Sequence, residues 1–174
     1  MHSALGNSPW TVLAEGTAEQ ISAPIGATTV ALSLVVLLAW VPLGQRIGLG
    51  TLLNAVIVGL GIDVTLGLLG DGSRALGVRA LEVFAAIALV SVGSGLYLTA
   101  RLGPGPRDGL MTGLAARTGR SIRLTRAGIE LSVCAVGVAL GGTLGLGTLA
   151  FALLIGPGVQ LVLAQLGALG VADL

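Results

Sequence analysis

The chain has 174 residues, of which 54% are hydrophobic and only 10% are charged, and its formal net charge at pH 7 is +1. A soluble domain carries about 25% charged residues, so this composition indicates an integral membrane protein whose solvent is lipid. All nine basic residues are arginine, and the chain has one cysteine and one histidine. This excludes a lysine phosphate loop, a Cys/His zinc site, a disulfide and a Ser-His-Asp triad. The low aromatic content, 3%, and the near-neutral charge argue against nucleic acid. We therefore expect no enzyme, cofactor, metal or nucleic-acid partner.

Five stretches of the chain are long and apolar enough to cross a bilayer, which takes about 20 residues in a helix. They are residues 27–43, 50–69, 80–100, 124–142 and 148–169. The fourth is the weakest, because Arg126 and Glu130 lie near its start. Their spacing places them on one face of a helix, where they can pair. The sequence therefore predicts an all-α polytopic membrane protein with about five transmembrane helices.

The chain resembles itself at an offset of 97 residues. Residues 48–52 (GLGTL) recur as residues 145–149, and residues 5–6 (LG) recur as residues 102–103. The repeat unit consists of one span, a Gly/Pro loop with a short amphipathic segment, and two further spans. An odd number of spans per unit makes the two copies cross the membrane in opposite senses, which is an inverted-topology repeat.

The repeat predicts one membrane domain over residues 1–174 with two copies in it. The first copy covers about residues 1–70 and the second about residues 80–169. The span that opens the second copy has no counterpart before the first, so we expect the first copy to lack its opening helix. The short segments 11–21 and 109–118 cannot span a bilayer, and we expect them to be interfacial or re-entrant.

The arginines predict the orientation, because basic residues collect in cytoplasmic loops. If the predicted spans alternate sides, seven arginines share one side and two lie on the other. The seven are Arg46, Arg101, Arg107, Arg117, Arg120, Arg123 and Arg126, and the two are Arg74 and Arg79. We therefore expect the N-terminus outside and the C-terminus inside. The arginines within residues 101–126 are expected near lipid headgroups, and a funnel for an anionic substrate is the alternative.

Two glycine-rich interruptions occupy the same position in the two copies. Gly59 and Gly61 lie in the second predicted span, and Gly156, Pro157 and Gly158 lie in the fifth. In transporters built from inverted repeats, substrate and ion sites lie where matched helices break, and proline frees backbone polar groups there. The pattern predicts a binding site at these breaks. Close helix packing through glycine, without a ligand, is the alternative.

Asp63 follows the first interruption by about one turn, inside an apolar run, and its repeat counterpart is Gln160. A carboxylate at that depth is costly, so we predict that Asp63 binds or exchanges a proton or cation, with Gln160 on the opposite side of the site. The alternative is an acid that reaches the outer interface. Asn54 precedes the interruption and either lines the cavity or bonds across helices.

Asp108 follows a Gly/Pro loop and is predicted to cap the helix that begins there. A gate, in which Asp108 pairs with Arg107 or Arg117 and moves with the loop, is the alternative. Trp10 and Trp40 suit the aromatic belt at a membrane interface.

Residues 102–110 (LGPGPRDGL), followed by residues 118–121 (TGRS), resemble the signature of the YczE/YyaS/YitT family of bacterial integral membrane proteins. Residues 5–10 (LGNSPW), with residues 48–51 (GLGT) and 59–63 (GLGID) downstream, resemble it as well. The resemblance implies a small, multi-span, permease-like protein of the bacterial cytoplasmic membrane.

These patterns predict a small permease or secondary transporter of a low-molecular-weight solute, with proton or cation coupling as an option. The alternative is a non-transporting membrane accessory protein that scaffolds or regulates a partner complex. The expected partners are the lipid bilayer, a small solute or a proton or cation, and a second copy or another membrane protein.

Overall fold

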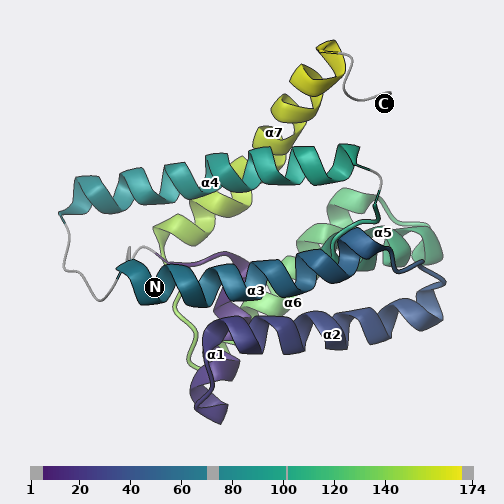
Figure 1. Cartoon of the computed structure of the whole chain (residues 1–174). Helices are drawn as coiled ribbons and strands as arrows, with labels where there is room; N and C mark the ends of the chain where they lie inside the picture. The colour runs from purple at the N-terminus through teal and green to yellow at the C-terminus, as the bar shows by residue number, and fades with distance from the viewer. Residues whose placement is uncertain (1–5, 70–74, 101, 170–174) are drawn as a thin grey trace.

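A computed structural model describes residues 6–69, 75–100 and 102–169, and over these ranges the chain forms helices and no strand (Figure 1). The helices, in chain order, are α1 (Pro9–Ile21), α2 (Ile25–Leu43), α3 (Leu49–Leu69), α4 (Leu76–Thr99), α5 (Pro106–Thr118), α6 (Ile122–Ala139) and α7 (Leu146–Ala168). The parts of the sequence analysis that rest on residues 1–5, Arg74 and Arg101 lie outside the described residues.

Among the described residues, four helices are long and apolar enough to cross a membrane, namely α2, α3, α4 and α7. Their outward side chains are large and apolar, as in Leu68 and Val41, which are 81% and 76% exposed. A surface of this kind is stable in lipid and not in water. The protein is therefore an all-α membrane protein.

The remaining predicted span corresponds to α6, which has 18 residues and carries Arg123, Arg126 and Glu130. It is not among the long apolar helices of the described chain. The predicted pair between Arg126 and Glu130 is confirmed, with 3.0 Å between Nε and Oε1. Since both charges lie within one helix, they neutralise each other locally.

The helix boundaries recur along the chain. The helices that begin at Pro9, Ile25 and Leu49 each have a counterpart that begins 97 residues later, at Pro106, Ile122 and Leu146.

The left-handed positions of the described backbone recur with the same spacing. Gly6 and Gly103 are one such pair, and the others are Ser22 with Gly119 and Gly44 with Gly141. Positive φ is a special backbone state that glycine adopts freely. Its recurrence shows that the matched segments share turn geometry as well as helix ends.

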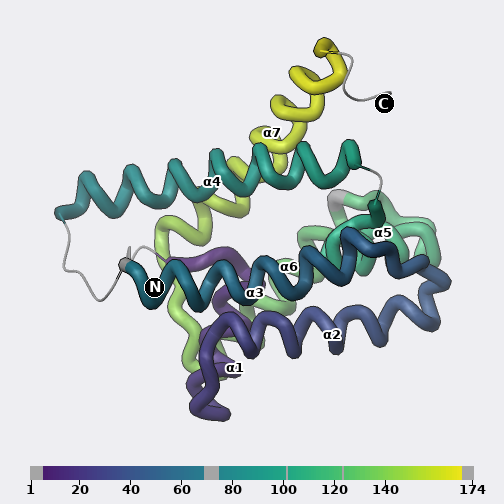
Figure 2. Tube along the Cα trace, viewed as in Figure 1, coloured from purple at the N-terminus to yellow at the C-terminus, as the bar shows by residue number. Residues whose placement is uncertain are grey.

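The two short helices, α1 and α5, both pack against α2 and α6 (Figure 2). Helix α3 lies along α2. The core lies where these helices meet, and its members are Trp10, Val36, Leu37 and Trp40, with Leu13, Leu110, Ile129 and Val133 packed against them. Helix α4 pairs with α7, which crosses it and projects beyond it in Figure 1.

The tryptophan prediction is wrong, because both indoles belong to this core. Trp10 is 7% exposed and Trp40 is fully buried. Trp40 lies against Gly109, whose missing side chain makes room for the ring, and its Nε1 donates to the Pro106 carbonyl at 3.0 Å. A buried indole whose N–H has found an acceptor is stable without an interface.

The predicted helix interruptions are also wrong. Helix α3 is continuous through Gly59 and Gly61, and α7 is continuous through Gly156, Pro157 and Gly158. The glycines that make contacts allow close helix packing, which was the alternative interpretation of the sequence. A side chain at Gly59 would meet α2 at Gly26 and Val30, and one at Gly158 would meet Ser91 of α4.

Candidate binding site at the centre of the bundle

One side chain from the first turn of each short helix meets the other inside the bundle. Trp10 is the second residue of α1 and Arg107 is the second residue of α5, and the two are separated by the same 97 residues. The guanidinium carbon of Arg107 lies 5.1 Å from the centroid of the Trp10 ring. This is a cation–π contact in a partly desolvated place, where such contacts are strongest.

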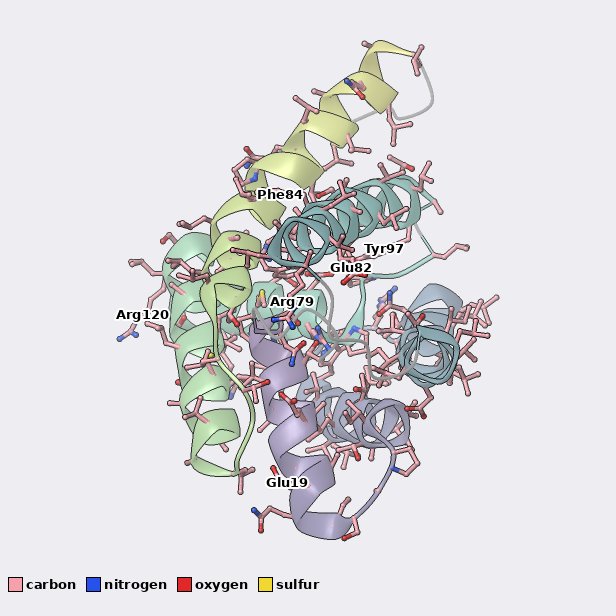
Figure 3. All side chains as sticks on the ribbon, turned by 90° about the vertical axis from the view of Figure 1, so that its left-hand side faces the viewer. Glu19, Arg79, Glu82, Phe84, Tyr97 and Arg120 are labelled. Atoms are coloured by element: carbon pink, nitrogen blue, oxygen red, sulfur yellow. The ribbon has the colours of Figure 1, made fainter. Side chains whose placement is uncertain are left out.

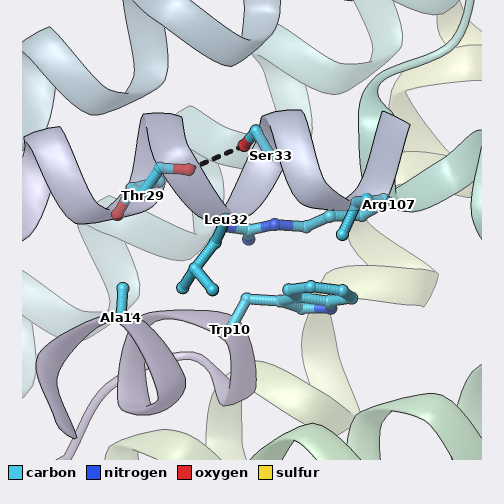
Figure 4. Close-up of a pocket in the computed structure, with 7 residues that line it drawn as sticks. Trp10, Ala14, Thr29, Leu32, Ser33 and Arg107 are labelled. Carbon is cyan, nitrogen blue, oxygen red and sulfur yellow. Dashed lines mark hydrogen bonds between the residues drawn. The ribbon is translucent and has the colours of Figure 1, made fainter. Parts of the chain in front are cut away.

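A small cavity adjoins this contact (Figure 4). Its lining residues come from α1, α2 and α5, and they are Trp10, Ala14, Thr29, Leu32, Ser33, Val36 and Arg107. Arg107 is the one charged member of this lining. The cavity has room for roughly one water molecule.

Two hydroxyl side chains occupy successive turns of α2 at this cavity. Thr29 donates to the Ile25 carbonyl at 2.9 Å, and Ser33 donates to the Thr29 carbonyl at 2.8 Å. Both hydroxyls are therefore satisfied by their own helix, and they make one wall of the cavity polar without adding charge.

The charge of Arg107 is poorly compensated. Desolvation lowers the pKa of Arg107 to about 10, although Asp108 and Glu130 act in the opposite direction. Asp108 accepts a hydrogen bond from the Tyr97 hydroxyl, and Glu130 pairs with Arg126. Within the described ranges, no hydrogen bond or ion pair joins the guanidinium of Arg107. A half-buried arginine whose guanidinium makes no direct hydrogen bond or ion pair is a site at which a ligand would be stabilised.

The indole Nε1 of Trp10 is a second unsatisfied group. This nitrogen is buried and has no hydrogen-bond partner in the described structure. Buried donors are almost always paired, and this one lies on the edge of the ring that faces away from Arg107 (Figure 4).

The loop before α5 is held in place by the first half of the chain. Gly103 has a φ of +108°, which allows the chain to turn toward the elbow between α2 and α3. There the hydroxyl of Thr51, which is fully buried, donates to the Pro104 carbonyl at 2.7 Å, and the Gly50 N–H donates to the Leu102 carbonyl at 2.9 Å. These bonds position the start of α5, and with it Arg107.

The same loop carries a second polar cluster, around Gly105. A side chain placed at Gly105 would lie 3.1 Å from Asn54 Oδ1 and 3.4 Å from both Asp108 Oδ2 and the Tyr97 hydroxyl. Tyr97 lies on the side of α4 that faces the other helices, whereas Arg120 projects outward (Figure 3). The structure thus brings the predicted site residues Asn54 and Asp108 together, with residues from α3, α4 and α5.

Asp108 does not cap α5. The N-cap residue is Gly105, and Asp108 lies in the first turn with its carboxylate bonded to Tyr97. Arg117 donates to the Pro42 carbonyl. Arg107 lies in the bundle and not in a surface loop near headgroups, because its helix is packed on α2.

Asp63 has a clear structural partner. Its carboxylate accepts hydrogen bonds from the N–H groups of Gly26 at 2.7 Å and Ala27 at 3.2 Å. The N-cap residue of α2 is Pro24, which offers no side-chain acceptor, so Asp63 of α3 satisfies these N–H groups. Its negative charge also lies at the positive end of the helix dipole. Proton or cation binding by Asp63 stays a prediction.

The other predicted site residues lie apart from Asp63. Gln160, Gly156 and Pro157 belong to α7, whose main packing partner is α4, whereas α3 packs on α2. Gln160 is exposed. Over residues 6–69, 75–100 and 102–169, no three His, Cys, Asp or Glu side chains gather as metal ligands would.

Sequence reasoning missed Trp10, Thr29, Ser33 and Tyr97 as parts of polar sites. Two signals were available. Thr29 and Ser33 are hydroxyls four residues apart in an apolar helix, which places them on one face. Tyr97 is the one tyrosine of the chain and lies in an apolar span, where a phenol needs a partner.

The sequence profile of a family of unknown function, DUF6198, matches residues 1–164. The chain belongs to this family. It is 45% identical over 161 residues to an uncharacterized protein of Haemophilus influenzae, a match that covers 92% of this chain and 73% of the relative. It is 34% identical over 161 residues to the uncharacterized membrane protein YczE of Bacillus subtilis, covering 88% of this chain and 71% of that protein. The resemblance to the YczE family is therefore confirmed. No solved structure matches this chain significantly.

Proposed function

We propose that this protein is a small-solute permease built from two inverted repeats, with its substrate site on the axis that relates them. The observation that carries the proposal is the contact between Trp10 and Arg107 beside a cavity. These residues are counterparts at the offset of 97, so a two-fold axis that relates the copies would pass between them. In transporters built from inverted repeats, the substrate site lies at the interface of the repeats.

The repeat is supported by the recurrence of helix starts and of left-handed residues at one spacing. It is also supported by reciprocal contacts. Gly103 adjoins the hydroxyl of Thr51, and Gly6, its counterpart, adjoins the hydroxyl of Thr148, which is the counterpart of Thr51. Each loop therefore lies against the elbow of the other half, as a two-fold relation requires.

The inverted sense follows if α6 is counted as a span, because α4, α6 and α7 then form an odd number. The arginine asymmetry agrees with that sense even without Arg107. We propose an orientation with the N-terminus outside and the C-terminus inside the bacterial cytoplasmic membrane. In this arrangement α1 and α5 are re-entrant, and rocking of one half against the other exposes the axis to either side.

The test is solute flux into liposomes that contain the purified protein. Amino acids, nucleobases, organic acids and inorganic ions are supplied in turn, with and without a pH or sodium gradient. We expect at least one solute to enter faster than into empty liposomes, and Arg107→Gln to reduce that rate at least tenfold. Arg120→Gln is the control, because Arg120 points away from the bundle (Figure 3). Equal rates in protein-containing and empty liposomes for all solutes would contradict transport.

One observation favours a second candidate, a membrane accessory protein that binds another membrane protein. Ile155 of α7 is 6% exposed beside α4, whereas its counterpart Val58 on α3 is 41% exposed. Gly158 contacts Ser91 of α4, whereas its counterpart Gly61 has nothing near it. A face that is covered in one half and open in the other fits a partner helix. Cross-linking in native membranes from a cysteine at Gly61 would identify that partner as a stoichiometric second protein.

A further inference from the structure

We propose that the cavity beside the contact between Trp10 and Arg107 binds a small monovalent anion, of the size of a chloride ion. The inference rests on the proposed permease function in one respect, since it names the class of substrate that would occupy the axial site. The binding itself is a separate property that can be measured at equilibrium.

The sign of the ligand follows from the charges around the cavity. Arg107 is the one charged residue in its lining. Two acids, Asp108 and Glu130, act electrostatically on Arg107. Asp108 is already hydrogen-bonded to Tyr97, and Glu130 is paired with Arg126. A cation placed there would face an arginine, and an anion would supply the missing counter-charge.

The hydrogen-bond donors of the cavity also favour an anionic ligand. The guanidinium of Arg107 has five N–H groups, and none is engaged in the described part of the chain. The N–H of Trp10 is unpartnered, and this residue is more than nine-tenths buried. Thr29 and Ser33 give their hydrogens to backbone carbonyls. The cavity thus offers the free donors of Arg107 and lacks a carboxylate acceptor, which is the pattern of an anion site.

The size and charge of the ligand follow from the walls. With room for roughly one water molecule, the cavity excludes amino acids, nucleobases and larger organic acids in this conformation. Ala14, Leu32 and Val36 make the rest of the wall apolar. Such a wall penalises strongly hydrated divalent anions more than monovalent ones, because they lose more hydration energy.

The first experiment measures thermal unfolding of the purified full chain in detergent. Sodium fluoride, chloride and bromide are compared with sodium gluconate, which is too large for the cavity, at constant ionic strength. We expect at least one small anion to raise the unfolding midpoint by about 5 °C at a hundredfold excess over its Kd. Arg107→Gln is expected to abolish the shift, and Arg120→Gln to keep it. The absence of any shift, or a full shift in Arg107→Gln, would overturn the proposal.

A second measurement covers the case in which Arg107→Gln does not fold. Trp10 and Trp40 are the two tryptophans of the chain, and Arg107 lies against Trp10. Bromide bound at Arg107 should therefore quench tryptophan emission with a saturable dependence that chloride competes away. Arg107→Lys keeps the charge without the planar fork, and we expect it to bind at least tenfold more weakly. Linear, unsaturable quenching in the parent protein would count against the site.

The two proposals fail in different ways. If a small anion binds with these properties but no solute crosses liposomes, the anion site holds and the permease function is wrong. If a neutral or cationic solute is transported in an Arg107-dependent way and no anion binds, the permease function holds and the anion class is wrong.

Discussion

The crossing of α5 with α2 and the crossing of α1 with α6 occupy corresponding places in the two halves, but they are filled in opposite ways. In the first, the Trp40 ring of α2 lies against Gly109 of α5. In the second, the counterpart of Trp40 is Gly137 of α6, and the counterpart of Gly109 is Val12 of α1. Gly137 lies directly on the backbone of α1, and Val12 is fully buried. The larger side chain thus comes from α2 at the first crossing, whereas at the second it comes from α1, the counterpart of α5.

The same contrast runs through the polar residues. Thr29 and Ser33 of α2 correspond to Arg126 and Glu130 of α6, and Trp10 corresponds to Arg107. At these three positions the first half has neutral side chains and the second half has charged ones. The comparison teaches that the same helix arrangement can recur with different side chains, provided that the side chains at each crossing still fill the space between the helices.

The largest expected effect comes from Gly137→Ala. The added Cβ would lie 2.6 Å from the Leu13 nitrogen, and a backbone atom cannot turn aside as a side chain can. We expect a loss of about 3 kcal/mol or more in the free energy of unfolding. Titration with sodium dodecyl sulfate in mixed micelles measures it. A variant as stable as the parent would show that α1 and α6 do not cross this closely.

Gly109→Ala should have a smaller effect, which a second substitution should partly relieve. Its Cβ would collide with the Trp40 ring, which is a side chain and can be exchanged. We expect a loss of about 2 kcal/mol, measured in the same titration. Trp40→Leu makes room, so the double variant should lose less than the sum of the two single variants. Additive losses would contradict direct contact between these residues.

Gly158→Ala and Gly61→Ala form a matched pair on α7 and α3. At Gly158 the new methyl group meets Ser91, and we expect a loss of about 1 kcal/mol. At Gly61 nothing lies within 4 Å, so the better helix propensity of alanine should stabilise α3 by about 0.5 kcal/mol. Thermal unfolding in detergent compares the two variants. Destabilisation by Gly61→Ala in membranes but not in detergent would indicate a partner helix on α3.

Asp63→Asn tests a contact that only one half possesses. The amide keeps one acceptor oxygen but loses the charge that faces the N-terminus of α2, so we expect a loss of about 1 kcal/mol. Gln160→Asn, at the counterpart position on α7, is the control and should leave the unfolding midpoint unchanged. Solute flux is measured alongside stability. If Asp63→Asn changes the dependence of flux on pH or sodium while stability is unaltered, Asp63 acts in ion coupling and the helix cap is secondary.

Local signals were sufficient for the helices themselves. Pro9 and Pro106 mark helix starts because their fixed φ suits the first turn, and Gly44 and Gly119 mark ends because they tolerate positive φ. The pairing of Arg126 with Glu130 was equally predictable, since it depends on spacing within one helix. Such features need only near neighbours in the sequence.

The site was predicted less well, because its residues come from different helices. Gly59 and Pro157 suggested broken helices, but α3 and α7 continue through these positions. Trp40 suggested an interface, but Gly109 lies 69 positions away in the sequence and opens the space that buries it. Neither contact leaves a local signature.

The sequence by itself determined that this chain is a helical membrane protein and that its segments recur at a spacing of 97 residues, because hydropathy, proline and glycine act locally. Only the tertiary structure decided what surrounds its charged side chains. Asp63 lies at the start of α2 and Asp108 lies beside Tyr97, while Arg107 lies over Trp10 next to a cavity. Whether a charge is compensated depends on distances between helices, and those distances follow from how side chains of different size fill each crossing.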